Sequence, residues 1–342
     1  MIIFPRMLSL LFAVLLGAAE LRAQGADVLN RGTLVVANRE GGSVSFLDLE
    51  IGVEVARLPV GPHIPHEVAV SPDGRWVITS AYGGGPGRHL VVLDLRNPRE
   101  TGRIDLGERS GPHSMAFLAD NRRAVATMEE SDRIALVDVV SLQILRTYPT
   151  GGREGHMVRL SPDERRAYIT SRGAEGTLSV IFLEEQRDPV VIPTGAGAEG
   201  LAVSPDGGEV WVANRDADTL SVVDTETFQV VATLEARPDT NRIEITASGL
   251  VLAPNASEGG AVAVYDLDTQ KLLRNVPLRK TGASGGAFGI FAHGTHAFIA
   301  DRSNGDIVML DPSRPEAPSL LIDGRDSPDG MAWSPLRVAP FE

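Results

Sequence analysis

The sequence contains no cysteine, which excludes disulfides and a lipid anchor on an N-terminal cysteine. Its stability must therefore come from apolar burial and from hydrogen-bonded strands. Basic charge is also scarce: the formal net charge is −13 at pH 7, and Lys271 and Lys280 are the only lysines. Generic nucleic-acid binding depends on basic side chains that displace counterions, so no such binding is expected.

Long apolar runs are missing except near the N-terminus. There Arg6 precedes the apolar run Met7–Ala19, and a small residue, Ala23, offers a cleavage point. The run is too short for a membrane span and is typical of a secretory signal peptide. We therefore predict a signal peptide at residues 1–23, one domain at residues 24–342 without a membrane span, and a periplasmic or secreted location.

What the sequence does contain is a repeat. Short apolar runs such as "LVVLD" and "LSVVD" end at equivalent positions separated by 42 to 46 residues: Asp48, Asp94, Asp138, Phe182, Asp224, Asp266 and Asp311. Each unit also has further period-two runs and a turn such as Ser-Pro-Asp-Gly (71–74 and 204–207), whose Pro and Gly suit a type I turn. Seven units of short strands predict an all-β, seven-bladed β-propeller of four-stranded antiparallel blades.

The two ends of the chain complete one of these units. The segment "DGMAWSP" (329–335) reads as a first strand and turn, whereas "TLVVAN" (33–38) reads as a second strand. We therefore predict that the N- and C-terminal strands share one blade. Closing the ring in this way removes sheet edges that would otherwise be exposed.

The motifs "SPDG", "VWVAN" and "LSVVD", clearest between Ser204 and Asp224, resemble the YVTN-type repeat of YncE-like seven-bladed propellers. That family is related to the propeller lactonases. The resemblance covers essentially the whole chain after the predicted signal peptide, and it implies the fold. It does not imply a chemistry, because the motif residues are those of turns and strands.

One position at the start of each innermost strand should face the central channel. Blade by blade, it holds His66, His113, His156, Glu199, Asn241, Gly286 and Asp329. Imidazoles that converge with a carboxylate suit a divalent first-row metal, so the three histidines are predicted metal ligands. Glu199 and the nearby His63 are the catalytic candidates. The alternative is that the histidines pack in the channel and bond backbone carbonyls.

Arginine is concentrated on the same face. Second strands are followed by Arg39, Arg172, Arg215 and Arg302, and the loops before innermost strands add Arg109, Arg153, Arg237, Arg242 and Arg325. Guanidinium groups pair with carboxylates or phosphates, so Arg39, Arg172, Arg215, Arg302 and Arg242 are predicted to bind a small anion together with Asn241 and Asp329. The alternative is that carboxylates such as Glu40, Asp216 and Asp301 hold the arginines in ion pairs between blades.

Two other motif matches lack the context that they need. The stretch "GAGAEG" (195–200) fits a dinucleotide fingerprint, but no helix is expected after it, so no nucleotide cofactor is expected. The stretch around Ser284 resembles a nucleophile elbow, which also requires a following helix.

Three functions remain open at this point. The first is an exported propeller that binds a small anionic molecule or a partner protein at the channel rim. The second is a metal-assisted lactone hydrolase or lyase acting on a carboxylated sugar or lactone, with a divalent first-row ion that activates water. The third is a non-catalytic cell-surface scaffold.

Overall fold

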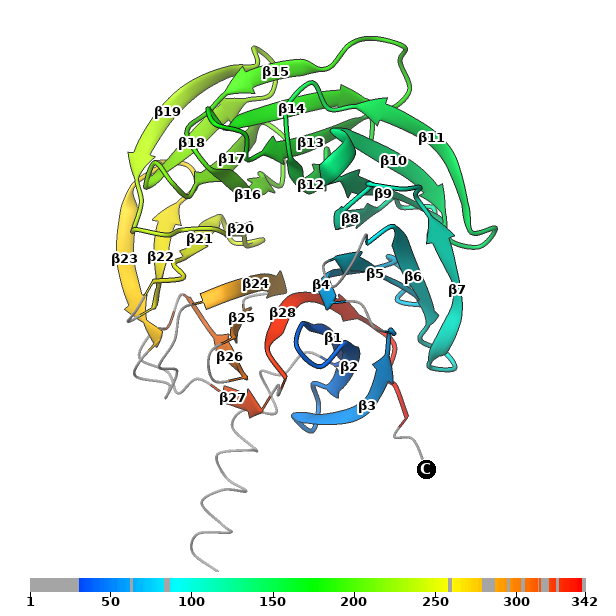
Figure 1. The fold of residues 1–342 in the computed structure, drawn as a ribbon. Coiled ribbons are helices and arrows are strands. Elements are labelled where there is room, and N and C mark those ends of the chain that lie inside the picture. Colours follow the sequence, from blue (N-terminus) through cyan, green and yellow to red (C-terminus); the bar gives the residue numbers. More distant parts are fainter. Residues whose placement is uncertain are drawn as a thin grey trace, which may run out of the picture.

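The computed structural model describes residues 31–61, 64–82, 87–257, 260–278, 287–293, 296–302, 305–312, 314, 320–323 and 326–339. These residues form seven four-stranded antiparallel sheets arranged as blades around a central channel (Figure 1). The predicted seven-bladed propeller is thereby confirmed. The predictions for residues 1–23, His63, Ser284, Gly286 and Arg325 lie outside the described residues.

From the innermost strand outward, three blades consist of β28 (Pro328–Ser334), β1 (Thr33–Asn38), β2 (Ser43–Asp48) and β3 (Val53–Pro59); of β4 (Ile64–Val70), β5 (Trp76–Tyr82), β6 (His89–Asp94) and β7 (Arg99–Asp105); and of β8 (Pro112–Phe117), β9 (Arg123–Met128), β10 (Arg133–Asp138) and β11 (Gln143–Pro149). The next two consist of β12 (Gly155–Leu160), β13 (Arg166–Ser171), β14 (Thr177–Phe182) and β15 (Val190–Pro193); and of β16 (Ala198–Val203), β17 (Glu209–Asn214), β18 (Thr219–Asp224) and β19 (Gln229–Glu235). The last two consist of β20 (Glu244–Ile245), β21 (Leu250–Pro254), β22 (Ala261–Asp266) and β23 (Leu272–Pro277); and of β24 (Ala287–His293), β25 (His296–Asp301), β26 (Asp306–Leu310) and β27 (Leu320–Asp323).

Helix is confined, within this described part, to one 3-10 turn at Glu129–Ser131. Accordingly, no described helix has the length and apolar character that crossing a membrane would require.

The ring closes where strands from opposite ends of the chain pair. Strand β28 pairs antiparallel with β1, with Thr33 opposite Ser334, and Figure 1 shows these strands side by side in red and blue. The hydroxyl of Thr33 donates to the carbonyl of Leu336 at 2.8 Å, and the hydroxyl of Ser334 donates to the carbonyl of Gly74 on the neighbouring blade, also at 2.8 Å. The predicted shared blade is confirmed.

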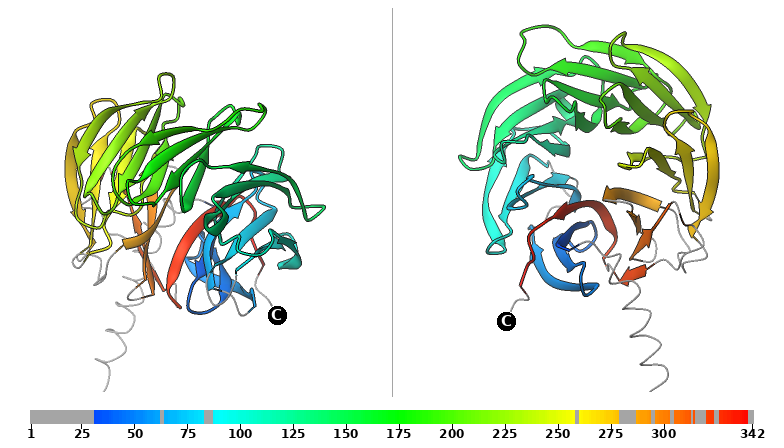
Figure 2. Two further views of the ribbon diagram at one scale, coloured as in Figure 1. Left: turned by 45° about the horizontal axis from the view of Figure 1, so that its top comes forward. Right: turned by 180° about the vertical axis from the view of Figure 1, so that it is seen from behind.

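The repeated residues hold the turns and the strand pairs. In the turn at 71–74, the Ser71 hydroxyl donates to Asp73 at 2.6 Å and accepts from the backbone N–H of Trp76 at 2.9 Å. At the end of β17, buried Asn214 donates to the hydroxyls of Thr219 and Ser221 on β18. Between blades, adjacent sheets pack face to face, as the two views in Figure 2 show, and bury apolar side chains between them.

A β-bulge recurs near the start of the innermost strands. The pairing register shifts between Pro65 and Val68 on β4, between Pro112 and Met115 on β8, and at equivalent places on β12, β16 and β24. A bulge sets two residues opposite one and breaks the strict alternation of side chains. Two consecutive residues of one strand can therefore both face the channel.

Candidate binding site at the channel mouth

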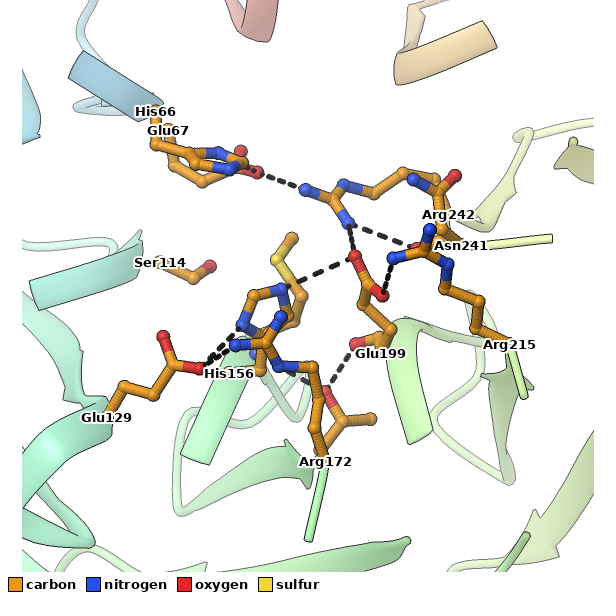
Figure 3. A network of polar contacts seen from close by, with 12 residues as sticks. His66, Glu67, Ser114, Glu129, His156, Arg172, Glu199, Arg215, Asn241 and Arg242 are labelled. Carbon is orange, nitrogen blue, oxygen red and sulfur yellow. Dashed lines mark hydrogen bonds and ion pairs between the residues drawn. The ribbon is translucent and has the colours of Figure 1, made fainter. Parts of the chain in front are cut away.

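The structure brings the predicted channel-facing residues together at the mouth of the channel. All six that it describes are buried, with 8% or less of the residue exposed: His66, His113, His156, Glu199, Asn241 and Asp329. Figure 3 shows several of them pointing toward one another from different blades. Equivalent positions in the repeat thus become neighbours in space.

The three imidazoles form a stack. The ring centroid of His113 lies 4.5 Å from that of His66 and 3.6 Å from that of His156. The Tyr82 ring meets both His66 and His113 edge-on, with centroids at 5.3 and 5.0 Å. Burial, and then the neighbouring histidines, lower the pKa of His113 well below its ordinary value, so this imidazole is neutral. The histidines therefore pack against one another, which is one part of the alternative interpretation of the sequence; the described residues show no bond from His113 or His156 to a backbone carbonyl, which is the other part.

Arg242 crosses the channel and joins two distant blades. Its Nη2 lies 2.9 Å from Oε1 of Glu67 on β4, and its Nη1 lies 3.0 Å from Oε1 of Glu199 on β16 (Figure 3). Burial alone would raise the pKa of Glu67, but Arg242 and then His66 hold it at about 2. Burial likewise opposes the charge of Arg242, yet Glu67 and Glu199 raise its pKa above the ordinary value. Both partners of the buried pair are charged.

Glu199 is held from three sides. In addition to Arg242, Nε2 of His156 lies 3.5 Å from Oε1, and Nη1 of Arg215 lies 3.4 Å from Oε2. Burial favours the neutral acid, but the neighbouring imidazole of His156 and the charge of Arg242 move the pKa of Glu199 well below its ordinary value. A carboxylate so stabilised is a weak proton acceptor at neutral pH. This geometry favours an ion-pair role over the predicted role as a catalytic base.

Of the five arginines predicted to bind an anion, Arg242 is held by Glu67 and Glu199, and three of the four that follow second strands also lie in ion pairs between blades. Arg172 pairs with Glu129, Arg215 pairs with Asp239, and Nη2 of Arg302 lies 2.7 Å from Oδ2 of Asp329. This arrangement matches the alternative in which carboxylates hold the arginines. The carboxylates that hold these arginines are Glu129, Asp239 and Asp329. The sequence had suggested different ones, namely Glu40, Asp216 and Asp301.

The remaining arginine, Arg39, follows β1 and is half-buried. Its backbone N–H donates to the carbonyl of Ser327, and its side chain takes part in none of the ion pairs between described residues.

A cavity of about 720 Å³, here called the rim cavity, has Tyr82 in its wall, and the Tyr82 ring also contacts the histidine stack. It is open to solvent and lined by residues at the ends of β5, β9 and β13 and in the loops before β8 and β12. Its charged and aromatic lining comprises Tyr82, Arg109, Glu129, Glu130, Asp132, Arg153, Glu154 and Arg172. Arg109 and Arg153 are exposed, and no ion pair among the described residues includes either of them. These two cations are free to meet a ligand.

A second cavity of about 260 Å³, the channel cavity, lies farther along the innermost strands. Its lining includes the residue one past each of the six described ring positions: Glu67, Ser114, Met157, Gly200, Arg242 and Gly330. Glu67 was missed from the sequence, although counting one residue onward would have found it. A Cβ on Gly330 would lie 2.6 Å from the Cα of Glu67, so β28 approaches β4 this closely only with glycine.

The stretch "GAGAEG" also has a structural use. It forms a turn and the start of β16, and a Cβ on Gly200 would lie 2.7 Å from the Cα of Arg242. Its last glycine therefore gives Arg242 room to reach the channel.

The chain is similar to known proteins in both sequence and fold. The profile of the YNCE-like beta-propeller family matches residues 29–288. Protein NirF of Stutzerimonas stutzeri is 24% identical over 297 residues, which cover 79% of this chain and 73% of NirF. The uncharacterized protein YncE of Salmonella typhi is 28% identical over 236 residues, which cover 64% of each chain.

Two solved structures are similar in fold. A functionally unknown protein from Desulfotomaculum acetoxidans DSM 771 has a TM-score of 0.71 at 15% identity, and the match covers 89% of this chain and 99% of that one. The dihydro-heme d1 dehydrogenase NirN, solved in complex with DHE, has a TM-score of 0.61 at 18% identity, with 82% of this chain and 61% of NirN covered. At these identities the likeness concerns the fold alone.

Proposed function

Since the chain belongs to the YNCE-like beta-propeller family, we propose that its rim cavity binds a small molecule that carries carboxylates. The observation that carries this proposal is the pair Arg109 and Arg153, two exposed cations in the wall of a cavity of about 720 Å³. That volume lies within the range of small-molecule sites, and guanidinium groups bind carboxylates through paired hydrogen bonds.

The ligand class proposed is a tetrapyrrole with carboxylate side chains. One fold neighbour is named as a heme d1 enzyme solved with a ligand, and NirF is a relative over most of its length. The arginines suit the carboxylates of such a ligand, and the Tyr82 ring suits its flat face. Acidic Glu130 and Asp132 share the wall, which favours a ligand with carboxylates at one edge over an anion charged on all sides.

A titration followed by the porphyrin absorption band tests this proposal. We expect saturable binding of a porphyrin with free propionates, and much weaker binding of the same porphyrin as its methyl ester. Arg109→Ala and Arg153→Ala should each weaken binding by about tenfold, the worth of one charged hydrogen bond. The matched control is Arg165→Ala, an exposed arginine paired with Glu184 away from the cavity lining, which should bind as the unchanged protein does.

Equal affinity for the acid and the ester would contradict the proposal, as would unchanged binding by the Arg109 and Arg153 variants. The hydrolase or lyase and the cell-surface scaffold stay predictions from the sequence. If the protein is only a scaffold, neither the porphyrin acid nor its methyl ester should bind.

We also propose that this binding takes place after export, because residues 1–23 have the pattern of a signal peptide. N-terminal sequencing of protein recovered from the periplasmic fraction or the medium tests this. The expected first residue is Gln24, and an intact Met1 on the recovered protein would contradict export by cleavage.

A further inference from the structure

Two neighbouring blades present a compact set of metal-binding groups at the channel. His66 and Glu67 lie on β4 and His113 lies on β8, and one donor atom from each lies within 4.8 Å of the others. The bulge on β4 makes this possible, because it breaks the alternation that would send His66 and Glu67 to opposite faces.

His113 lacks partners that a buried imidazole requires. The residue is fully buried, and neither of its ring nitrogens has a hydrogen-bond partner among the described residues. Leaving buried polar atoms unpaired costs free energy, so such atoms point to a bound species. The rings of His66 and His156 cover His113, so the species it binds must lie in the plane of the imidazole, where its nitrogens point.

The surroundings of His66 and Glu67 also suit metal binding. Oδ2 of Asp329 lies 3.2 Å from Nδ1 of His66, so a carboxylate stands beside this imidazole, as carboxylates do beside metal-bound histidines, although the two atoms form no hydrogen bond. The ion pair with Arg242 involves Oε1 of Glu67, and a carboxylate has further acceptor capacity on both oxygens.

From this geometry we propose that His66, His113 and Glu67 bind a divalent first-row transition ion such as Zn²⁺. Two imidazoles and one carboxylate are a donor set that such ions prefer. The set differs from the one predicted from the sequence: Glu67 enters and His156 leaves, because His156 instead lies between Glu129 and Glu199. The site does not depend on the porphyrin proposal, since it needs no rim arginine.

The test uses the full protein, freed of any affinity tag and of metal, titrated with Co²⁺ and Zn²⁺ in the absence of porphyrin. Calorimetry gives the stoichiometry and affinity, and visible absorption of Co²⁺ reports nitrogen and oxygen ligation. A single equivalent should bind. Glu67→Gln and His113→Ala should abolish stoichiometric binding, and Asp329→Asn should weaken it by about 10- to 100-fold.

Three variants serve as controls. His156→Gln should still bind one equivalent of the metal ion. This result would distinguish the proposed ligands from the three histidines that the sequence predicted. His296→Gln, a buried histidine on β25, and Arg153→Ala should also bind as the unchanged protein does. Circular dichroism of each metal-free variant shows that it is folded before titration, and the near-isosteric Glu67→Gln keeps the test decisive if His113→Ala does not fold.

Binding of less than about one tenth of an equivalent by the unchanged protein would overturn the proposal. So would a folded Glu67→Gln variant that binds the ion as tightly as the unchanged protein, or loss of the ion in His156→Gln alone.

Discussion

Arg242 and Glu67 lie 175 residues apart in the sequence and form an ion pair of 2.9 Å across the central channel. The same guanidinium pairs with Glu199, so three blades are tied together at one point. Removing one member of a buried pair leaves the other charges without compensation, which costs far more than loss of an exposed pair.

Arg242→Met should lower the free energy of unfolding by about 3–5 kcal/mol, because Glu67 and Glu199 remain buried without their partner. Arg165→Met, which removes an exposed pair with Glu184, should cost less than about 1 kcal/mol. Urea unfolding of both variants measures the difference. Equal and small losses would show that the cross-channel pair contributes little.

Stability should fall in acid because of Glu67. Its pKa is about 2 in the folded protein and near 4.5 when unperturbed, so its contribution is present above about pH 4.5 and is lost as the pH falls toward 2. Urea midpoints measured across this window should drop less steeply for Glu67→Gln than for the unchanged protein. Glu184→Gln, an exposed carboxylate, is the matched control and should leave the slope unchanged.

His113 should make the stability of the protein depend on pH below about 6.5. Burial lowers its pKa well below 6.5, so the unfolded chain takes up a proton below pH 6.5 that the folded protein does not. Stability therefore rises with pH up to about 6.5, by at most about 1.4 kcal/mol per pH unit from this group. In the presence of a chelator, His113→Leu should remove part of the slope between pH 5 and 6.5. An identical slope in the variant would mean that His113 titrates normally.

The close approach of β28 to β4 depends on Gly330. Gly330→Ala would place a Cβ 2.6 Å from the Cα of Glu67, so a strand must shift, at a cost of about 1–3 kcal/mol. Gly208→Ala is the control, since the atoms nearest to a Cβ there belong to the Asp206 side chain and lie at 3.4 Å or more. Thermal unfolding compares the two. Equal melting temperatures would show that the inner strands adjust freely.

The fold was predictable because each blade repeats the same turn and strand residues, and Ser71 and Asn214 hold those turns and strand pairs in the structure. The ring of channel residues was also predictable, since equivalent positions in a closed ring converge. Glu67 was missed because period-two alternation sends it away from His66, whereas the bulge brings both to the channel. The partnership of Arg172 with Glu129 depends on how neighbouring blades pack, for which the sequence carries no local signal.

A structure of the protein crystallised with a carboxylated porphyrin tests the central claim most directly. The account predicts ligand density in the rim cavity, with the ring beside Tyr82 and carboxylates within hydrogen-bond distance of Arg109 and Arg153. Porphyrin density in the channel cavity or on the outer strands, with the rim cavity empty, would contradict it.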